Sequence, residues 1–287
     1  MNTISRELGK IRFLILADFR VQMLFRLGIL IQLLNVTIAA ASYYFLTTLF
    51  HGSSEVMKRY STDVVSYILL GLTMNPIFTT SLVGFISALE TTYVSRALER
   101  IMMAPTSPYS LFFSRMANGY ITSIIAALLY LAIGIAVFRV RLGTGNPLAV
   151  LLILLLGAIA TIAVGMLLAQ VFFYTYTGKG SGGSVVIFVQ GFMSVFTGAT
   201  FPIEVLPTPL RWISAMLPQT HAIRAARLVL AGRAIFDTVI IQDLLFLIGF
   251  CMVMLPVGVW LMRKGLEHMR KEGYSPQPRF ATARRFG

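Results

Sequence analysis

The sequence predicts an all-α membrane protein with six transmembrane helices, and three observations lead to this fold class. Of the 287 residues, 57% are hydrophobic. Only 12% are charged, about half the share found in soluble globular proteins. The apolar residues also gather in long runs, and a run of about 20 is what a helix needs to cross a bilayer. Intrinsic disorder, which requires low hydrophobicity and high charge, is excluded.

The elements follow in order along the chain. Ile4, Leu8, Ile11 and Ile15 recur on one helical face, which predicts an amphipathic helix over residues 4–22 lying in the membrane interface. The six predicted spans cover residues 27–50, 64–89, 116–138, 148–173, 184–202 and 240–262. The chain is thus divided into a transmembrane domain, residues 1–262, and a basic tail, residues 263–287.

The basic residues orient these spans. The formal net charge is +13, and no stretch is polar enough to form a soluble nucleic-acid-binding domain, so the partners do not include nucleic acid. With the N-terminus inside, 16 of the 24 Lys and Arg face the cytoplasm. By the positive-inside rule this predicts a multi-pass protein of the cell (plasma) membrane with both termini cytoplasmic. The segment 203–239 is the exception, since four Arg would lie outside.

Candidate catalytic residues are not found. The three His are far apart in sequence, and Asp243, at the outer end of the last span, is interpreted as an interfacial carboxylate. Cys251 is the single cysteine and lies in an apolar run, so neither a disulfide nor a metal site is expected. The segment around Gly178 and Lys179 lacks the residues of a phosphate-binding loop. We therefore expect no enzyme activity, metal or cofactor in this chain.

Polar residues within the predicted spans have two interpretations. An amide in lipid needs a hydrogen-bonding partner or a water-filled cavity, so these residues either join helices or line a transport path. The candidate path residues, with the aromatic residues that accompany them, are Gln32, Asn35, Asn75, Phe78, Phe188, Gln190 and Phe192. In the fourth span, Gly157, Thr161, Gly165 and Ala169 form a stripe of small residues, which predicts close approach by another helix.

Two longer connections resemble a known family. After the second span, Leu98, Glu99, Ile101, Pro105 and Ser107 fit the cytoplasmic pattern of ABC-2 type transporter permeases, although Arg96 and Ala97 stand where that family has Gly-Thr. The second match contains Gly198, Pro202, Leu206, Pro207, Pro218 and Arg227. In that family the second segment forms short outer helices that re-enter the membrane between spans 5 and 6. Pro202, Pro207, Pro209 and Pro218 independently favour short helices, since proline interrupts a long one.

The resemblance implies a membrane subunit of an ABC exporter. Two copies would form a homodimer in membrane lipid, and each would contact one of two copies of a separate P-loop ATPase subunit, which binds ATP and magnesium. The implied ATPase-coupling residues are Leu98, Glu99, Arg100, Ile101, Met102, Met103 and Pro105.

The substrate is the least determined property. The apolar spans suggest an amphipathic or lipophilic cargo, and residues 217–224 look more like the drug-exporter branch than the branch that exports lipid-linked polysaccharide. Multidrug export is therefore expected, with polysaccharide export as the alternative. An ATP-independent channel or carrier and a membrane scaffold are the alternatives of another class.

Overall fold

The computed structural model describes residues 31, 34–39, 41–42, 64–94, 108–139, 145–175, 181–200 and 202–272. Within these residues the fold is helical and contains no strand. The long helices are α4 (Val64–Val94), α6 (Pro108–Ala136), α7 (Pro147–Thr175) and α11 (Thr238–Glu272). The shorter ones are α8 (Ser181–Phe196), η1 (Ile203–Val205), α9 (Thr208–Met216) and α10 (Pro218–Leu230).

Four helices in the described part of the chain are long and apolar enough to cross a membrane. They contain the segments Ser66–Leu89, Ser114–Ala136, Pro147–Gln170 and Thr238–Gly265. These segments agree with the second, third, fourth and sixth predicted spans. Most of the predicted first span (27–50), the interfacial helix (4–22) and residues 273–287 of the tail lie outside the described residues, so the six-span arrangement stays a prediction.

The predicted fifth span, 184–202, differs from the helix that forms there. Helix α8 has 16 residues and ends at Phe196, so it is about 24 Å long at 1.5 Å per residue, shorter than a bilayer core of about 30 Å. Gly198 follows with φ of 70°, a left-handed conformation that turns the chain out of the helix. The span therefore stops before Pro202 because the backbone turns four residues earlier.

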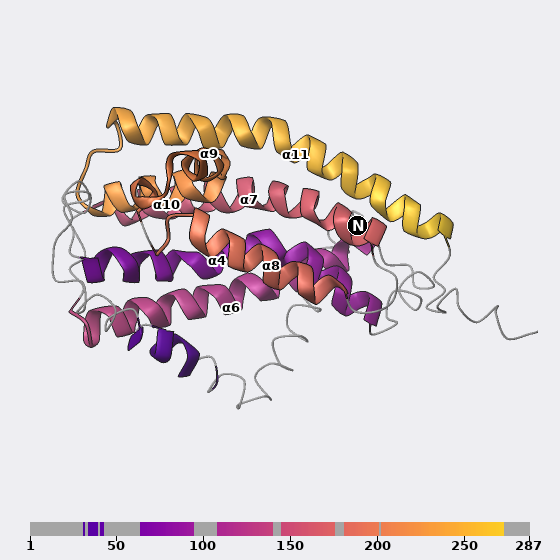
Figure 1. The fold of residues 1–287 in the computed structure, drawn as a ribbon, viewed down its shortest axis with the longest axis horizontal. Helices are drawn as coiled ribbons and strands as arrows, with labels where there is room; N and C mark the ends of the chain where they lie inside the picture. The colour runs from indigo at the N-terminus through magenta and orange to yellow at the C-terminus, as the bar shows by residue number, and fades with distance from the viewer. Residues whose placement is uncertain are drawn as a thin grey trace, which may run out of the picture.

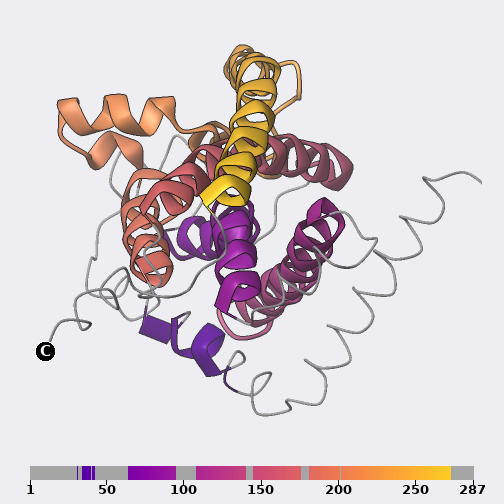
Figure 2. The same cartoon turned by 90° about the vertical axis from the view of Figure 1, so that its right-hand side faces the viewer.

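The long helices lie side by side (Figure 1). Helices α4, α7 and α11 begin, and α6 and α8 end, at the end of the bundle where α10 lies; we call this the α10 end. Helix α7 packs against α4, α10 and α11. Viewed from the opposite end, α9 projects sideways from the bundle (Figure 2). The short helices α9 and α10 thus lie towards one end of the longer helices.

The small-residue stripe on α7 is confirmed as a packing surface. A Cβ atom on Gly165 would lie 2.5 Å from the carbonyl oxygen of Leu82 on α4, and one on Gly157 would overlap Ala222 on α10. Thr161 and Ala169 are both 0% exposed. Small side chains therefore let α4 and α10 approach the α7 backbone closely.

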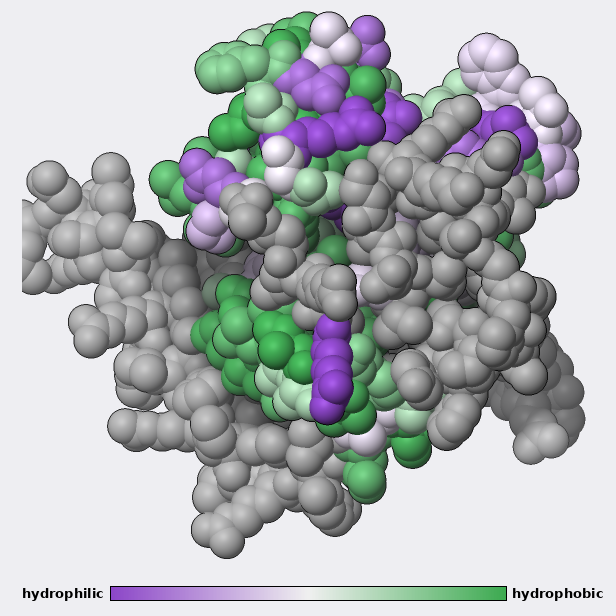
Figure 3. Space-filling model, turned by 90° about the vertical axis from the view of Figure 1, so that its left-hand side faces the viewer, coloured by the Kyte–Doolittle hydropathy of each residue, from purple (hydrophilic) through white to green (hydrophobic). Residues whose placement is uncertain are grey.

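The outer surface of α11 is apolar over most of its length. Leu245, Met252 and Trp260 are all more than half exposed, as expected for a helix that faces lipid. At the α10 end the surface changes, and hydrophilic residues gather in the upper part of the view onto that end (Figure 3). The α10 end therefore carries the polar surface of the described part of the chain that this view shows.

Candidate functional site

A buried carboxylate joins α10 to α11 at the α10 end. Asp243 on α11 has a side chain that is 0% exposed. Arg224 on α10 donates two hydrogen bonds to this carboxylate. Its Nε lies 2.9 Å from Oδ2, and a terminal nitrogen bonds to Oδ1. A buried carboxylate is costly unless it is paired and hydrogen-bonded, and the bidentate guanidinium supplies both conditions.

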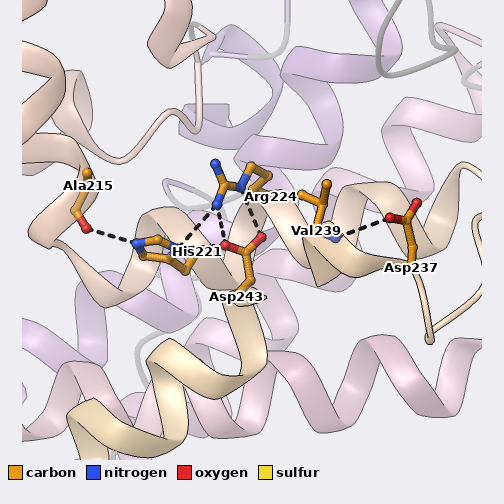
Figure 4. A network of polar contacts seen from close by, with 6 residues as sticks. All are labelled: Ala215, His221, Arg224, Asp237, Val239 and Asp243. Atoms are coloured by element: carbon orange, nitrogen blue, oxygen red, sulfur yellow. Dashed lines mark hydrogen bonds and ion pairs between the residues drawn. The ribbon is translucent and has the colours of Figure 1, made fainter. Parts of the chain in front are cut away.

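His221 extends this network to α9 (Figure 4). Its Nδ1 lies 2.6 Å from Oδ1 of Asp243, and its Nε2 lies 2.8 Å from the carbonyl oxygen of Ala215 on α9. The ring also stacks on Phe246 of α11, with centroids 4.0 Å apart. We call His221, Arg224 and Asp243 the polar triad. Through the carboxylate of Asp243 and the backbone carbonyl of Ala215, it joins α9, α10 and α11.

Arg227, also on α10, is a buried cation, 5% exposed. Its side chain donates to the carbonyl oxygens of Gly198, at 2.7 Å, of Ala199, at 2.5 Å, and of Tyr67, at 3.0 Å. The guanidinium also lies 3.6 Å from the centroid of the Tyr67 ring, a cation–π contact. Arg227 therefore fastens the turn after α8 to the start of α4.

The other two arginines of the 203–239 segment also have partners. Arg211 on α9 donates to the carbonyl oxygen of Leu206 at 2.7 Å and to that of Glu204. Arg233 pairs with Asp237 at 3.1 Å. All four arginines that oppose the positive-inside count therefore have partners in the folded structure, unlike the charges of an ordinary solvated loop.

Asp237 begins α11. Its Oδ1 accepts from the backbone N–H of Val239 at 3.1 Å, and its own carbonyl accepts from Ile241, as an N-cap does. The hydrogen bond from Val239 and the nearby Arg233 hold the pKa of the Asp237 carboxyl below its ordinary value.

The residues of the second family motif make the turns between the short helices. Pro202 precedes η1, and Pro207 is the N-cap of α9. Pro218 is the first residue of α10, where its missing N–H costs nothing. The backbone N–H of Leu206 bonds to the carbonyl of Ile203 at 3.0 Å and closes η1. Short helices therefore form between α8 and α11, as predicted; their position on the outer side and their depth in a membrane stay predictions.

The predicted path residues differ in burial: some lie in the apolar core and others on the surface of the single chain. Phe78 on α4 is 2% exposed and belongs to the main apolar core, whereas Asn75 is half-buried. Phe188 on α8 is 72% exposed and stacks on the half-buried Phe192. Asn35 and Gln190 are exposed on the single chain. Gln32 lies outside the described residues.

The predicted coupling residues, Leu98 to Pro105, also lie outside the described residues. The helices on either side of them are described: α4 ends at Val94 and α6 begins at Pro108. Both of these termini lie at the end of the bundle opposite α10.

Sequence reasoning missed the polar triad. The interpretation of Asp243 as an interfacial carboxylate names no partner for it, whereas the structure buries this carboxylate against His221 and Arg224. Two signals were available: a carboxylate inside a long apolar run needs a cation, and His221 and Arg224, three residues apart, share a helix face. In the described part of the chain no group of three or more His, Cys, Asp or Glu could hold a metal ion.

Comparison with known proteins gives one family. The model of a family described as "ABC-2 family transporter protein" matches residues 28–260, which is most of the chain. No curated protein matches the chain. The match spans all the helices described above except the last residues of α11.

Proposed function

The chain belongs to the ABC-2 family of transporter membrane proteins, and from this premise we propose that it is the permease subunit of an ATP-driven exporter. Members of this family are the transmembrane component of ABC transporters, and the family implies an ATPase partner in general. The match over residues 28–260 is the observation that carries the proposal. In it, a separate ATPase drives alternating access, and an amphipathic or lipophilic substrate moves outward.

A second copy of the chain is part of this proposal. Gln190 is exposed on α8 and Asn35 on helical residues 34–39. An amide that faced hydrocarbon would leave its hydrogen-bonding groups unsatisfied, at a cost of several kcal/mol. Another subunit or a water-filled path between two subunits would satisfy both amides. Their exposure on the single chain therefore supports a homodimer in which α8 faces the partner or the path.

The α4–α6 pair offers a route for the ATPase to act. Two pairs of hydroxyls join these helices: Ser81 and Tyr120, at 2.7 Å, and Thr80 and Ser123. Because the two helices are bonded to one another, a displacement of the intervening segment would move both. This supports a coupling role for the segment around Glu99 and Met103, with both termini on the ATPase side.

Co-purification with a P-loop ATPase tests the proposal. We expect the two chains to form a complex in detergent, and substitutions Glu99→Ala and Met103→Ala to uncouple transport from ATP hydrolysis. Glu267→Ala is the matched control, since Glu267 is an exposed carboxylate on α11, outside the coupling segment. A chain that never associates with an ATPase, or that transports without ATP, would instead be a scaffold or an ATP-independent carrier.

The substrate is tested with vesicles that contain both subunits. Export of amphipathic dyes or drugs supports the proposed cargo, and export of a lipid-linked oligosaccharide supports the alternative. Gln190→Leu is expected to change the order of preferred substrates while the complex still assembles. Loss of assembly in this variant would assign Gln190 to packing.

A further inference from the structure

The C-terminal half of α11 has one face packed on the bundle and the opposite face free of it. A Cβ atom on Gly258 would lie 3.2 Å from Met166 on α7, and Met262 is 4% exposed in the same apolar cluster as Met166. Trp260 and Lys264 each follow by two residues, which is more than half a turn around the helix. Both are exposed, Trp260 at 59%. This part of α11 therefore presents an indole and an ammonium to the surroundings of the chain.

The position of Trp260 along α11 matches a membrane surface. A helix rises about 1.5 Å per residue, so Trp260 lies about 33 Å beyond Thr238, close to the thickness of a hydrocarbon core of about 30 Å. The only charged residue of α11 before Arg263 is Asp243, and Asp243 is 0% exposed. The outer surface of α11 thus changes from apolar to basic where a spanning helix leaves the hydrocarbon.

Two cations lie at this change of surface. Arg263 and Lys264 are exposed, and the ammonium of Lys264 lies 5.1 Å from the centroid of the Trp260 ring, a cation–π contact. Among the side chains that the structure describes, neither cation forms an ion pair. Glu267, the carboxylate that follows them, is also exposed, and residues 263–287 contain seven Lys and Arg against two Glu. The surface is therefore complementary to a negative charge.

The surroundings of the cations favour a phospholipid as the source of that charge. Val253 and Val257 precede Trp260 by seven and three residues, so they share its helix face, and they are 59% and 40% exposed. An acyl chain can lie along these valines while the indole stays at the level of the headgroups, where tryptophan is enriched. The phosphate accepts charge-assisted hydrogen bonds from Arg263 and Lys264. A free anion would use the cations alone and leave the apolar face uncovered.

We propose that Trp260, Arg263 and Lys264 form a binding surface for the headgroup of an anionic phospholipid. The net negative charge of such a headgroup distinguishes it from a zwitterionic one, whose own cation competes with the two side chains. The surface lies at the end of the bundle opposite α10 (Figure 1). Only the assignment of this end to the cytoplasmic leaflet rests on the proposed function. A bound lipid would fix the depth of α11 in the membrane at this end.

Tryptophan fluorescence tests the proposal directly. The chain has two Trp, so Trp212→Phe leaves Trp260 as the single indole of the full chain. The protein is reconstituted in phosphatidylcholine vesicles with a small fraction of either brominated phosphatidylglycerol or brominated phosphatidylcholine, since bromine quenches an indole that it contacts. We expect a preference of about five-fold for the anionic lipid, the effect of about one basic residue at an anionic surface. The preference should decrease as salt is added.

Substitutions of the charged residues identify the source of the preference. Arg263→Gln/Lys264→Gln should remove it, and this variant is expected to fold because both side chains are exposed. Glu267→Gln, the matched control on the same exposed surface, should keep it. Equal quenching of Trp260 by the two lipids would overturn the proposal and leave the cations to an acidic protein partner. A preference that persists without both cations would also overturn it.

The second tryptophan is an internal control. Trp260→Phe leaves Trp212 on α9, which is 69% exposed but whose neighbour Arg211 already donates to backbone carbonyls. The two brominated lipids should quench Trp212 equally. A preference of the same size at Trp212 would indicate general enrichment of anionic lipid around the chain and would contradict a site on α11. None of these measurements needs an ATPase or a substrate, so failure here is distinct from failure of the proposed function.

Discussion

At the scale of single residues, the 203–239 segment is held by cations that satisfy backbone oxygens. A turn that leaves a helix end exposes carbonyl groups, and each buried one must find a donor. Arg227 supplies the donors for Gly198, Ala199 and Tyr67 at once. A guanidinium suits this position because its donors are fixed in a planar fork, which an ammonium cannot reproduce.

Arg227→Lys is therefore expected to destabilise the protein although the charge is kept. The shorter, single-centred ammonium leaves at least one buried carbonyl unpaired, at a cost of about 2–4 kcal/mol. The matched control is Arg233→Lys, since Arg233 forms an exposed pair with Asp237 and such pairs contribute about 1 kcal/mol or less. Thermal melting in detergent measures both. Equal melting temperatures for the two variants would refute the role assigned to Arg227.

The sequence pointed to Arg227 as a functional residue but not to His221, and it predicted the partners of neither. Arg227 was identified through a family pattern, without its partners, because the carbonyls that it binds lie as many as 160 residues away along the chain. His221 was passed over for the same reason: its partner Asp243 is on another helix. Local spacing predicts which residues share a helix face, but it does not predict which face of a distant helix comes to meet them.

At the scale of helices, periodicity and proline positions predicted most of the architecture. Four spans and the short helices after Gly198 lie where the apolar runs and prolines place them, because both signals act within one or two turns. The end of α8 was misplaced because an apolar run continues through the turn at Gly198. Hydropathy does not register a left-handed backbone, so the run appeared longer than the helix.

Gly71 lies where α4 passes close to that turn. A Cβ atom there would overlap the Ala199 carbonyl oxygen and the Arg227 guanidinium. Gly71→Ala should thus destabilise the protein by about 1–3 kcal/mol, the usual cost of overpacking, despite the better helix propensity of alanine. Gly191→Ala on α8 is the control, since no atom lies within 4 Å of the added methyl. Thermal melting in detergent should give a lower melting temperature for Gly71→Ala than for Gly191→Ala. Similar melting temperatures would show that the turn after α8 shifts to accommodate the methyl group at little cost.

The start of α11 gives a pH-dependent prediction. Because folding lowers the pKa of Asp237 from 3.8, its contribution to stability is present above that pH and is lost as the pH falls through the folded value. Asp237→Asn keeps a capping side chain but cannot ionise. The variant should melt below the wild type near pH 6, and the difference should shrink towards zero under more acidic conditions, below about pH 4. Melting curves of both proteins across this range are the measurement, and a constant difference would exclude the charge as its cause.

At the scale of the whole molecule, the single chain leaves two kinds of apolar surface uncovered. The surface of α11 is long enough to face lipid along a complete span. That of α8 is shorter and carries the exposed amide of Gln190 beside stacked aromatic rings. Lipid satisfies the first surface and leaves the amide of the second without a partner. We therefore interpret exposed side chains on α11 as facing lipid, and those on α8 as facing a second subunit or a water-filled path.

Cross-linking distinguishes these surfaces. Phe188 on α8 and Met252 on α11 are 72% and 73% exposed, so they are matched in exposure. In a Cys251→Ser background, which removes the only native cysteine, we expect a short bis-maleimide to link two copies through Phe188→Cys. Met252→Cys should give little dimer, because lipid separates it from other chains. Equal yields at both positions would indicate random collision in the membrane, and a yield confined to Met252 would place the partner on α11. Cross-linking through Phe188 alone would show that the aromatic face of α8 meets a second subunit, because only a specific interface selects between two side chains of equal exposure.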